Sequence, residues 1–291
     1  MATVAASREP RQGGNVVSSH PFLRCARVIA VAPLVLLPMR GVARADTPDV
    51  PAETTSRPIP VGRSWTYLDD PRLPAPLQAV VLSRATYTDS GASVTRPFAS
   101  NAGTPGGALE LGGEVGLAPR LALVASGVAG EAQAGGTAHH FGGIAGLRLS
   151  LLPAEWTASH LVASAGYVRD LDGGSGAWTR LTGTQDVGRL RLGGSLHAER
   201  IVGGARDAAD LMVTAGASFD VAPWARLGVE YVGQDLEEAL GDGAEGGARH
   251  FVGPTVAALL GDRVSLVGGP AFGLSAQSPR FVGRAALAYS F

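Results

Sequence analysis

The sequence predicts an all-β fold: an antiparallel up-and-down transmembrane β-barrel of about twelve strands (10–12). Three observations predict it. Segments of strand length with alternating apolar and polar residues fill the chain after residue 76, their number is even, and short and long connections alternate between them. No apolar run of about 20 residues follows residue 45, so this part of the chain could cross a membrane only with strands.

Residues 1–45 have the features of a signal peptide. Arg24 and Arg27 precede the apolar run 28–39, and the small residues Ala43 and Ala45 offer a cleavage site. The alternative is a membrane anchor, for which the run is short and broken by two prolines. The single cysteine, Cys25, lies in this region, so cleavage would leave no disulfide, thiol nucleophile or zinc–thiolate site.

The charge balance argues against a nucleic-acid partner. The formal net charge is −1, and residues 1–45 carry six Arg and one Glu, so the chain after cleavage has a net charge of about −6. A nucleic-acid-binding surface is basic. We therefore expect no nucleic-acid partner.

Residues 46–76 form a proline-rich tail without a sustained period, which indicates an extended or disordered segment. The alternative is that the part around residues 65–68, Trp-Thr-Tyr-Leu, folds into the lumen of the barrel as a plug. The barrel itself is predicted over residues 77–291.

The predicted strands alternate between an apolar and a polar or small face. The clearest is 189–199, in which Leu190, Leu192 and Leu196 share one face. Residues 77–88 and 178–187 are the weakest segments, and Pro254 and Pro270 each remove a ladder donor. In order, the segments are 77–88, 107–117, 120–130, 139–151, 157–169, 178–187, 189–199, 211–221, 225–235, 250–260, 263–274 and 279–291.

The connections fall into two classes. Those at 118–119, 152–156, 187–189, 222–224 and 261–262 are short. Those at 89–106, 131–138, 170–177, 200–209 and 236–247 are longer, and only 275–278 breaks the rule. Short turns at one end and long loops at the other are typical of barrels that span an outer membrane.

A secreted β-sandwich would also bury one apolar face of each strand. Two features favour the barrel: Arg, Glu and Gly share the polar faces, and aromatic residues lie near the segment ends, where a membrane-interface girdle is expected. These aromatic residues are Tyr167, Trp178, Phe219, Trp224, Tyr231, Phe251, Tyr289 and Phe291.

The last segment has apolar residues at alternate positions and ends on an aromatic residue. It resembles the C-terminal signature strand of bacterial outer-membrane β-barrel proteins. The resemblance implies an outer-membrane location, a periplasmic tail over 46–76, and lipid, lipopolysaccharide, periplasmic chaperones and the barrel assembly machinery as partners. The residues that would carry the assembly signal are Phe281, Leu287, Tyr289 and Phe291.

Charged residues on the inward faces are the candidate functional residues, because they would either line a pore or pair with each other and fill the lumen. We predict a small pore or passive transport channel for ions or small solutes. The alternative is a structural or surface-interaction protein with a filled lumen. The residues are Glu110, Glu114, Arg148, Arg191, His197, Glu199, Arg226, Glu230 and Arg284.

A lipid hydrolase is a weaker hypothesis. Ser195, His197 and Glu199 alternate on one strand face, but such neighbours lie about 6–7 Å apart, too far for the direct hydrogen bonds of a catalytic triad. The pair His139 and His140 and the acidic loop around residues 235–245 lack the ligand spacing of a metal site. We therefore expect no enzyme activity, no cofactor and no metal.

Overall fold

A computed structural model describes residues 65–88, 106–131, 139–153, 156–171, 173–203, 209–236 and 248–291. The predicted signal peptide, residues 46–64 of the tail and most of the acidic loop lie outside these ranges. Within them, no helix is long and apolar enough to cross a membrane.

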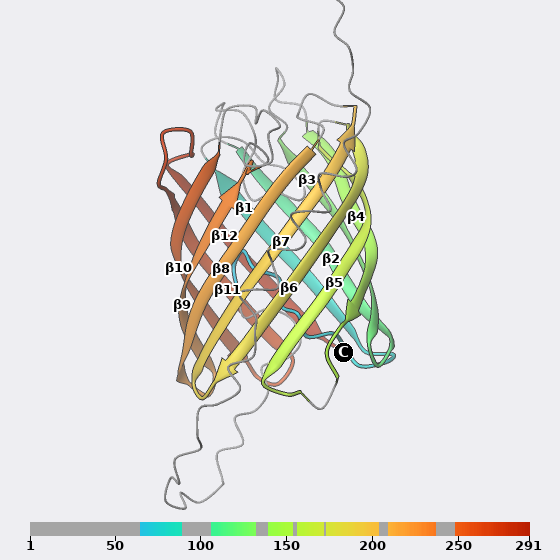
Figure 1. Cartoon of the computed structure of the whole chain (residues 1–291), viewed down its shortest axis with the longest axis vertical. Helices are drawn as coiled ribbons and strands as arrows, with labels where there is room; N and C mark the ends of the chain where they lie inside the picture. The colour runs from blue at the N-terminus through green and yellow to red at the C-terminus, as the bar shows by residue number, and fades with distance from the viewer. Residues whose placement is uncertain are drawn as a thin grey trace, which may run out of the picture. The chain divides into compact units, whose positions relative to one another are not determined.

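The described residues form one closed antiparallel barrel, in which each strand pairs with its neighbours in sequence and β1 pairs with β12 (Figure 1). This confirms the predicted fold class and strand number. The strands are β1 (Ala79–Thr88), β2 (Gly106–Ala118), β3 (Leu121–Glu131), β4 (His139–Ser150), β5 (Ser159–Arg169), β6 (Ser175–Val187), β7 (Leu190–Val202), β8 (Ala209–Ala222), β9 (Ala225–Gln234), β10 (Arg249–Leu260), β11 (Val264–Gly273) and β12 (Phe281–Ser290).

The short connections gather at the end of the barrel where the chain terminates (Figure 1). Gly188 and Gly261 have φ of 60° and 77°, which favours glycine in these tight turns. At the closure, β12 runs along β1 from Ser290 opposite Val80 to Val282 opposite Thr88. The terminal Phe291 donates its backbone N–H to Ala79 O at 2.8 Å, so the last strand has no unpaired edge.

Both strand prolines fall on the same ladder. Between β10 and β11 the paired positions run to Val252–Phe272 and resume at Val256–Gly268. Pro254 and Pro270 lie in that gap, and each stays in register with its other neighbour strand. The two missing N–H donors therefore interrupt one strand pair instead of two.

The outer face of the barrel is apolar on every side, which suits contact with lipid. Four of the eight predicted girdle aromatics are well exposed there, namely Tyr167, Phe219, Trp224 and Phe291, and Tyr231 and Tyr289 are partly exposed. The prediction was wrong for Trp178 and Phe251, which are 3% and 0% exposed and face the lumen.

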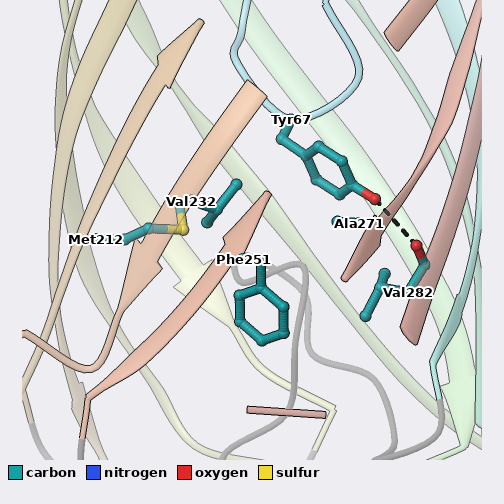
Figure 2. Close-up of a cluster of buried hydrophobic side chains, with 6 residues drawn as sticks. All are labelled: Tyr67, Met212, Val232, Phe251, Ala271 and Val282. Atoms are coloured by element: carbon teal, nitrogen blue, oxygen red, sulfur yellow. Dashed lines mark hydrogen bonds between the residues drawn. The ribbon is translucent and has the colours of Figure 1, made fainter. Parts of the chain in front are cut away.

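The lumen is not uniformly polar. Trp178 packs against Val168 and Ile201, and Phe251 belongs to a second cluster shown in Figure 2, with Tyr67, Met212, Val232, Ala271 and Val282. At these two clusters the strands carry apolar side chains on the inner face as well as on the outer face. An aromatic residue near a strand end therefore need not belong to a girdle.

Residues 65–74 lie inside the barrel, where most of them are buried. Trp65 and Leu68 are both 0% exposed. At the exposed end of this segment, Leu77 donates its N–H to Gly116 O at 2.9 Å and the chain turns into β1. For these residues the structure shows the alternative arrangement, a segment within the lumen, and not an extended tail.

Candidate functional site

The nine predicted inward charges all project into the lumen. Seven of them are buried, and Glu114 and Arg284 are partly buried, so most of these charges are shielded from bulk solvent. They surround residues 65–70, Trp-Thr-Tyr-Leu-Asp-Asp, which we call the plug segment. The candidate site is therefore the lumen together with the segment that occupies it.

Glu230, from the inward face of β9, holds the plug segment by its backbone. Its Oε1 accepts the N–H of Thr66 at 2.7 Å, and its Oε2 accepts the N–H groups of Tyr67 and Leu68, both at 2.9 Å. Three consecutive backbone donors that would otherwise be buried without partners are satisfied by one carboxylate. Glu230 is 1% exposed, so this contact is sealed from water.

The side chains of the plug segment fit a recess in the wall. Gly193 and Gly216 face each other across β7 and β8. A Cβ at Gly216 would lie 2.7 Å from Trp65 Cζ3, and one at Gly193 would lie 2.5 Å from Leu68 Cδ2. The lack of a side chain at both glycines thus allows the close approach of Trp65 and Leu68.

The plug segment also contacts β10, β11 and β12. The hydroxyl oxygen of Thr66 lies 2.5 Å from that of Thr255 on β10. Tyr67 Oη lies 3.3 Å from both Gly269 O and Val282 O, its contacts on β11 and β12, the second of which is marked in Figure 2. Arg284 lies over the Tyr67 ring, 5.6 Å from its centroid.

Asp69 and Asp70 meet arginines of the wall. Asp69 forms an ion pair with Arg180 on β6 and lies 3.9 Å from Arg84 on β1. Arg148 on β4 donates from Nη2 to the backbone carbonyl oxygen of Asp70 at 2.5 Å. The Asp70 carboxylate pairs with Arg72, two residues further along the same segment, also at 2.5 Å.

The environment of Asp70, which precedes the first strand, favours its charged form. Burial alone would raise the pKa of this carboxyl, but the Arg72 guanidinium beside it, the hydrogen bonds from Arg72 and the charge of Arg191 outweigh burial. The pKa is held well below its usual range, so Asp70 is ionised at neutral pH.

Wall charges pair inside the lumen, three of the pairs between neighbouring strands and the Arg148–Glu114 pair across β3. Arg84 pairs with Glu110 at 2.6 Å, Arg191 with Asp186 at 2.5 Å, and Arg148 with Glu114. Arg226 pairs with Asp220 at 2.6 Å. Mixed signs along the lumen are therefore neutralised locally.

A cavity of about 80 Å³ lies between the plug segment and the wall. It has room for a few water molecules. Among its lining groups are Arg84, Glu110, Glu114, Arg148, Arg180 and Arg284. The plug segment thus occupies the part of the lumen beside this cavity.

The expected separation of His197 and Glu199 was wrong. His197 Nε2 lies 3.3 Å from Glu199 Oε2, because the two long side chains lean together across the spacing of their strand. Arg180 donates from Nε to His197 Nδ1 at 3.2 Å. Both ring nitrogens are thus directed at groups other than Ser195, so no triad is assembled.

Several charged residues of the site were missed at the level of sequence, among them Arg84, Arg180, Asp69 and Asp70. Arg84 and Arg180 lie in the two weakest predicted segments, but each shares alternation with inward neighbours. This alternation could have identified both arginines as inward-facing. In the described part of the chain no three His, Cys, Asp or Glu side chains are grouped so as to hold a metal ion.

No protein-family model matches the chain, and no curated protein matches its sequence. Among solved structures, the chain is similar to the COG4313 outer membrane channel from Pseudomonas putida F1, with 12% identity and a TM-score of 0.54 over 76% of this chain and 97% of that one. The translocator domain of the autotransporter NalP from Neisseria meningitidis has 14% identity and a TM-score of 0.46, over 75% of this chain and 89% of that one.

The first of these likenesses shows the fold and nothing finer, because the identity is low. The fold is that of bacterial outer-membrane β-barrels, as the terminal strand predicted. No subfamily follows from it.

Proposed function

We propose that this protein is a passive outer-membrane channel for ions or small solutes, and that the plug segment closes it. The observation that carries the proposal is that residues outside the wall occupy the lumen, held there by hydrogen bonds, ion pairs and packing. Such contacts can be broken without unfolding a strand. Catalysis is not part of the proposal, since His197 is engaged by Arg180 and Glu199.

The wall behind the plug segment supports this proposal. Thr214, Ser218 and Thr255 are buried there with the charged groups, and their hydroxyls could be hydrated if the segment withdrew. The proposed outer-membrane location follows from the apolar outer face and the fold.

The second candidate is a structural barrel with a permanently filled lumen. It is favoured by the three inward apolar clusters and by the paired charges of the wall. In that case the plug segment is a part of the core, and its release would open no path.

A reversible lock separates the two candidates. The hydroxyl oxygens of Thr66 and Thr255 lie 2.5 Å apart, so Thr66→Cys and Thr255→Cys bring two thiols together at a position suited to an engineered disulfide between plug segment and wall. Cys25 is replaced by Ser, which leaves no other thiol. Single-channel currents are then recorded in planar bilayers under oxidising and reducing conditions.

The channel proposal expects discrete openings in the reduced protein and none in the oxidised protein, with the single variant Thr66→Cys insensitive to redox conditions. Folding is checked in every sample by heat-modifiable gel mobility. If a folded, reduced protein never opens, the lumen is permanently filled and the structural candidate stands.

A further inference from the structure

We propose that the wall arginines holding Asp69 form a binding site for carboxylate-bearing solutes, which Asp69 itself occupies while the channel is closed. This inference rests on the proposed function and names the class of solute that the channel takes. The plug segment then acts as an internal competitor: a solute carboxylate that takes the place of Asp69 weakens the closure.

The geometry shows a carboxylate already bound. The two oxygens of Asp69 face different arginines, Oδ2 pairing with Arg180 and Oδ1 lying 3.9 Å from Arg84. Next to them, Arg148 donates to the Asp70 carbonyl oxygen at 2.5 Å. The three guanidinium groups come from β6, β1 and β4, so a solute that binds them is held by separate parts of the wall.

Burial strengthens this recognition. The side chains of Arg84, Arg148 and Arg180 are 9%, 7% and 17% exposed, so a charge held between them is poorly screened. Arg84 and Arg148 are also paired to Glu110 and Glu114. These two glutamates keep the arginines ordered without occupying the position of Asp69.

The net charge of the cavity wall is positive, as a site for carboxylates requires. Its charged groups outside the N-terminal segment are four arginines, namely Arg84, Arg148, Arg180 and Arg284, and two glutamates, Glu110 and Glu114, a formal net charge of +2 without His197. Asp70 is neutralised by Arg72 of its own segment, so Asp69 is the carboxylate offered to the wall. A small carboxylate with a second acceptor oxygen reproduces what Asp69 and the Asp70 carbonyl present.

Succinate is a suitable probe of this chemistry. The reduced Thr66→Cys, Thr255→Cys protein is recorded in a potassium chloride gradient, with and without succinate. We expect the reversal potential to show preference for chloride over potassium, and succinate to block the open current. Arg180→Gln should weaken the block about tenfold, because one charge-assisted contact is lost.

The matched control is Arg249→Gln, which removes another buried lumen arginine, paired with Asp235. It should leave the succinate block unchanged. A channel that opens and closes with the redox lock but shows no succinate block, or loses it equally in both variants, overturns the carboxylate site and leaves the proposed function intact.

A second measurement does not depend on conductance. The thiol of the single variant Thr66→Cys is buried in the lumen, and its labelling by a membrane-impermeant maleimide reports withdrawal of the plug segment. We expect succinate to accelerate labelling, and Arg180→Gln to lower that acceleration about tenfold. A labelling rate independent of succinate rejects the inference, whether or not the protein conducts.

Discussion

Glu230 is the side chain on which the closure of the lumen depends most. Its carboxylate accepts three consecutive backbone N–H groups of the plug segment, at 2.7, 2.9 and 2.9 Å. A single buried acid thereby replaces the water that these donors would bind outside the barrel. Hydrogen bonds to a charged acceptor contribute more than neutral ones, and a lost acceptor leaves the donors with a desolvation cost.

Replacing this acid should loosen the plug segment while leaving the wall folded. In Glu230→Gln one acceptor oxygen and the charge are lost, which should disfavour the closed state by about 2 kcal/mol, or roughly thirtyfold in the closed-to-open ratio. The frequency of channel opening in bilayers measures this change. Asp220→Asn, which removes a wall acid paired with Arg226, should change that frequency little. Equal effects of the two variants would contradict the role of Glu230 in holding the plug segment.

Asp70 gives the closure a pH dependence with a definite sign. Its pKa is lowered in the closed state, because Arg72 and Arg191 outweigh the effect of burial. Its carboxylate therefore stabilises closure above the ordinary carboxyl pKa of about 4, and this contribution is lost as the pH falls toward the lower closed-state value.

Asp70→Asn should accordingly raise the opening frequency at pH 7. The difference from the unsubstituted protein should shrink as the pH is lowered below about 4, where Asp70 begins to be protonated in the open state. Bilayer recordings of both proteins over this range make the comparison, with Asp262→Asn in an exposed turn as the control. A difference that grows toward low pH would have the opposite sign and would refute the assignment.

The plug segment and the β7–β8 recess are complementary elements. Gly193 and Gly216 leave the wall without side chains where Trp65 and Leu68 pack. Deleting side chains from two paired positions has a cost in strand stability, since glycine packs nothing and loses more backbone entropy. The packing of two fully buried apolar side chains offsets that cost.

Filling the recess should expel the plug segment. Gly216→Val places a branched side chain where Trp65 lies, so Thr66→Cys labelling should rise at least several-fold while heat-modifiable mobility is retained. Gly127→Val is the matched control, because nothing lies within 4 Å of a Cβ at Gly127. Unchanged labelling in folded Gly216→Val would show that the segment does not need the recess.

Alternation predicted the wall well, since the period of two fixes which side chains face inward once a strand is recognised. It placed Arg148 and Glu230 correctly, and it also carried the true orientation of Trp178, which shares its face with Arg180. The interior position of Trp178 was missed because aromatic residues at strand ends also form girdles. The contacts of Trp65 could not be predicted, because the plug segment has no period and its partners lie more than a hundred residues away.

The whole barrel depends on one seam that joins the two ends of its sequence. β1 and β12 pair over nine positions, and Phe291 adds a final backbone hydrogen bond. The Phe291 side chain is 65% exposed and contacts Tyr289 with ring centroids 4.7 Å apart. It contributes little to the packing of the barrel, which leaves delivery and assembly as its proposed role.

Phe291→Ala should therefore separate assembly from stability. In cells, we expect the folded fraction in the outer membrane to fall several-fold, as measured by heat-modifiable mobility. The free energy of unfolding of the purified variant, refolded in detergent, should lie within about 1 kcal/mol of that of the unsubstituted protein, because an exposed side chain is removed. Phe141→Ala, which truncates an aromatic residue 73% exposed on β4, should affect neither measurement strongly. Equal losses in cells for both variants would remove the assembly role of Phe291.

The position of the plug segment ahead of β1 has a consequence for the order of biogenesis. Its contacts extend to β9, β10, β11 and β12, whereas its covalent link is to β1, the strand that must wait for β12. We expect the later strands to fold around it before the seam closes, because groups that hold it, such as Glu230 on β9, join the sheet before β12 pairs with β1. The sheet would then fold around the plug segment, and closure of the barrel and closure of the pore would be the same event.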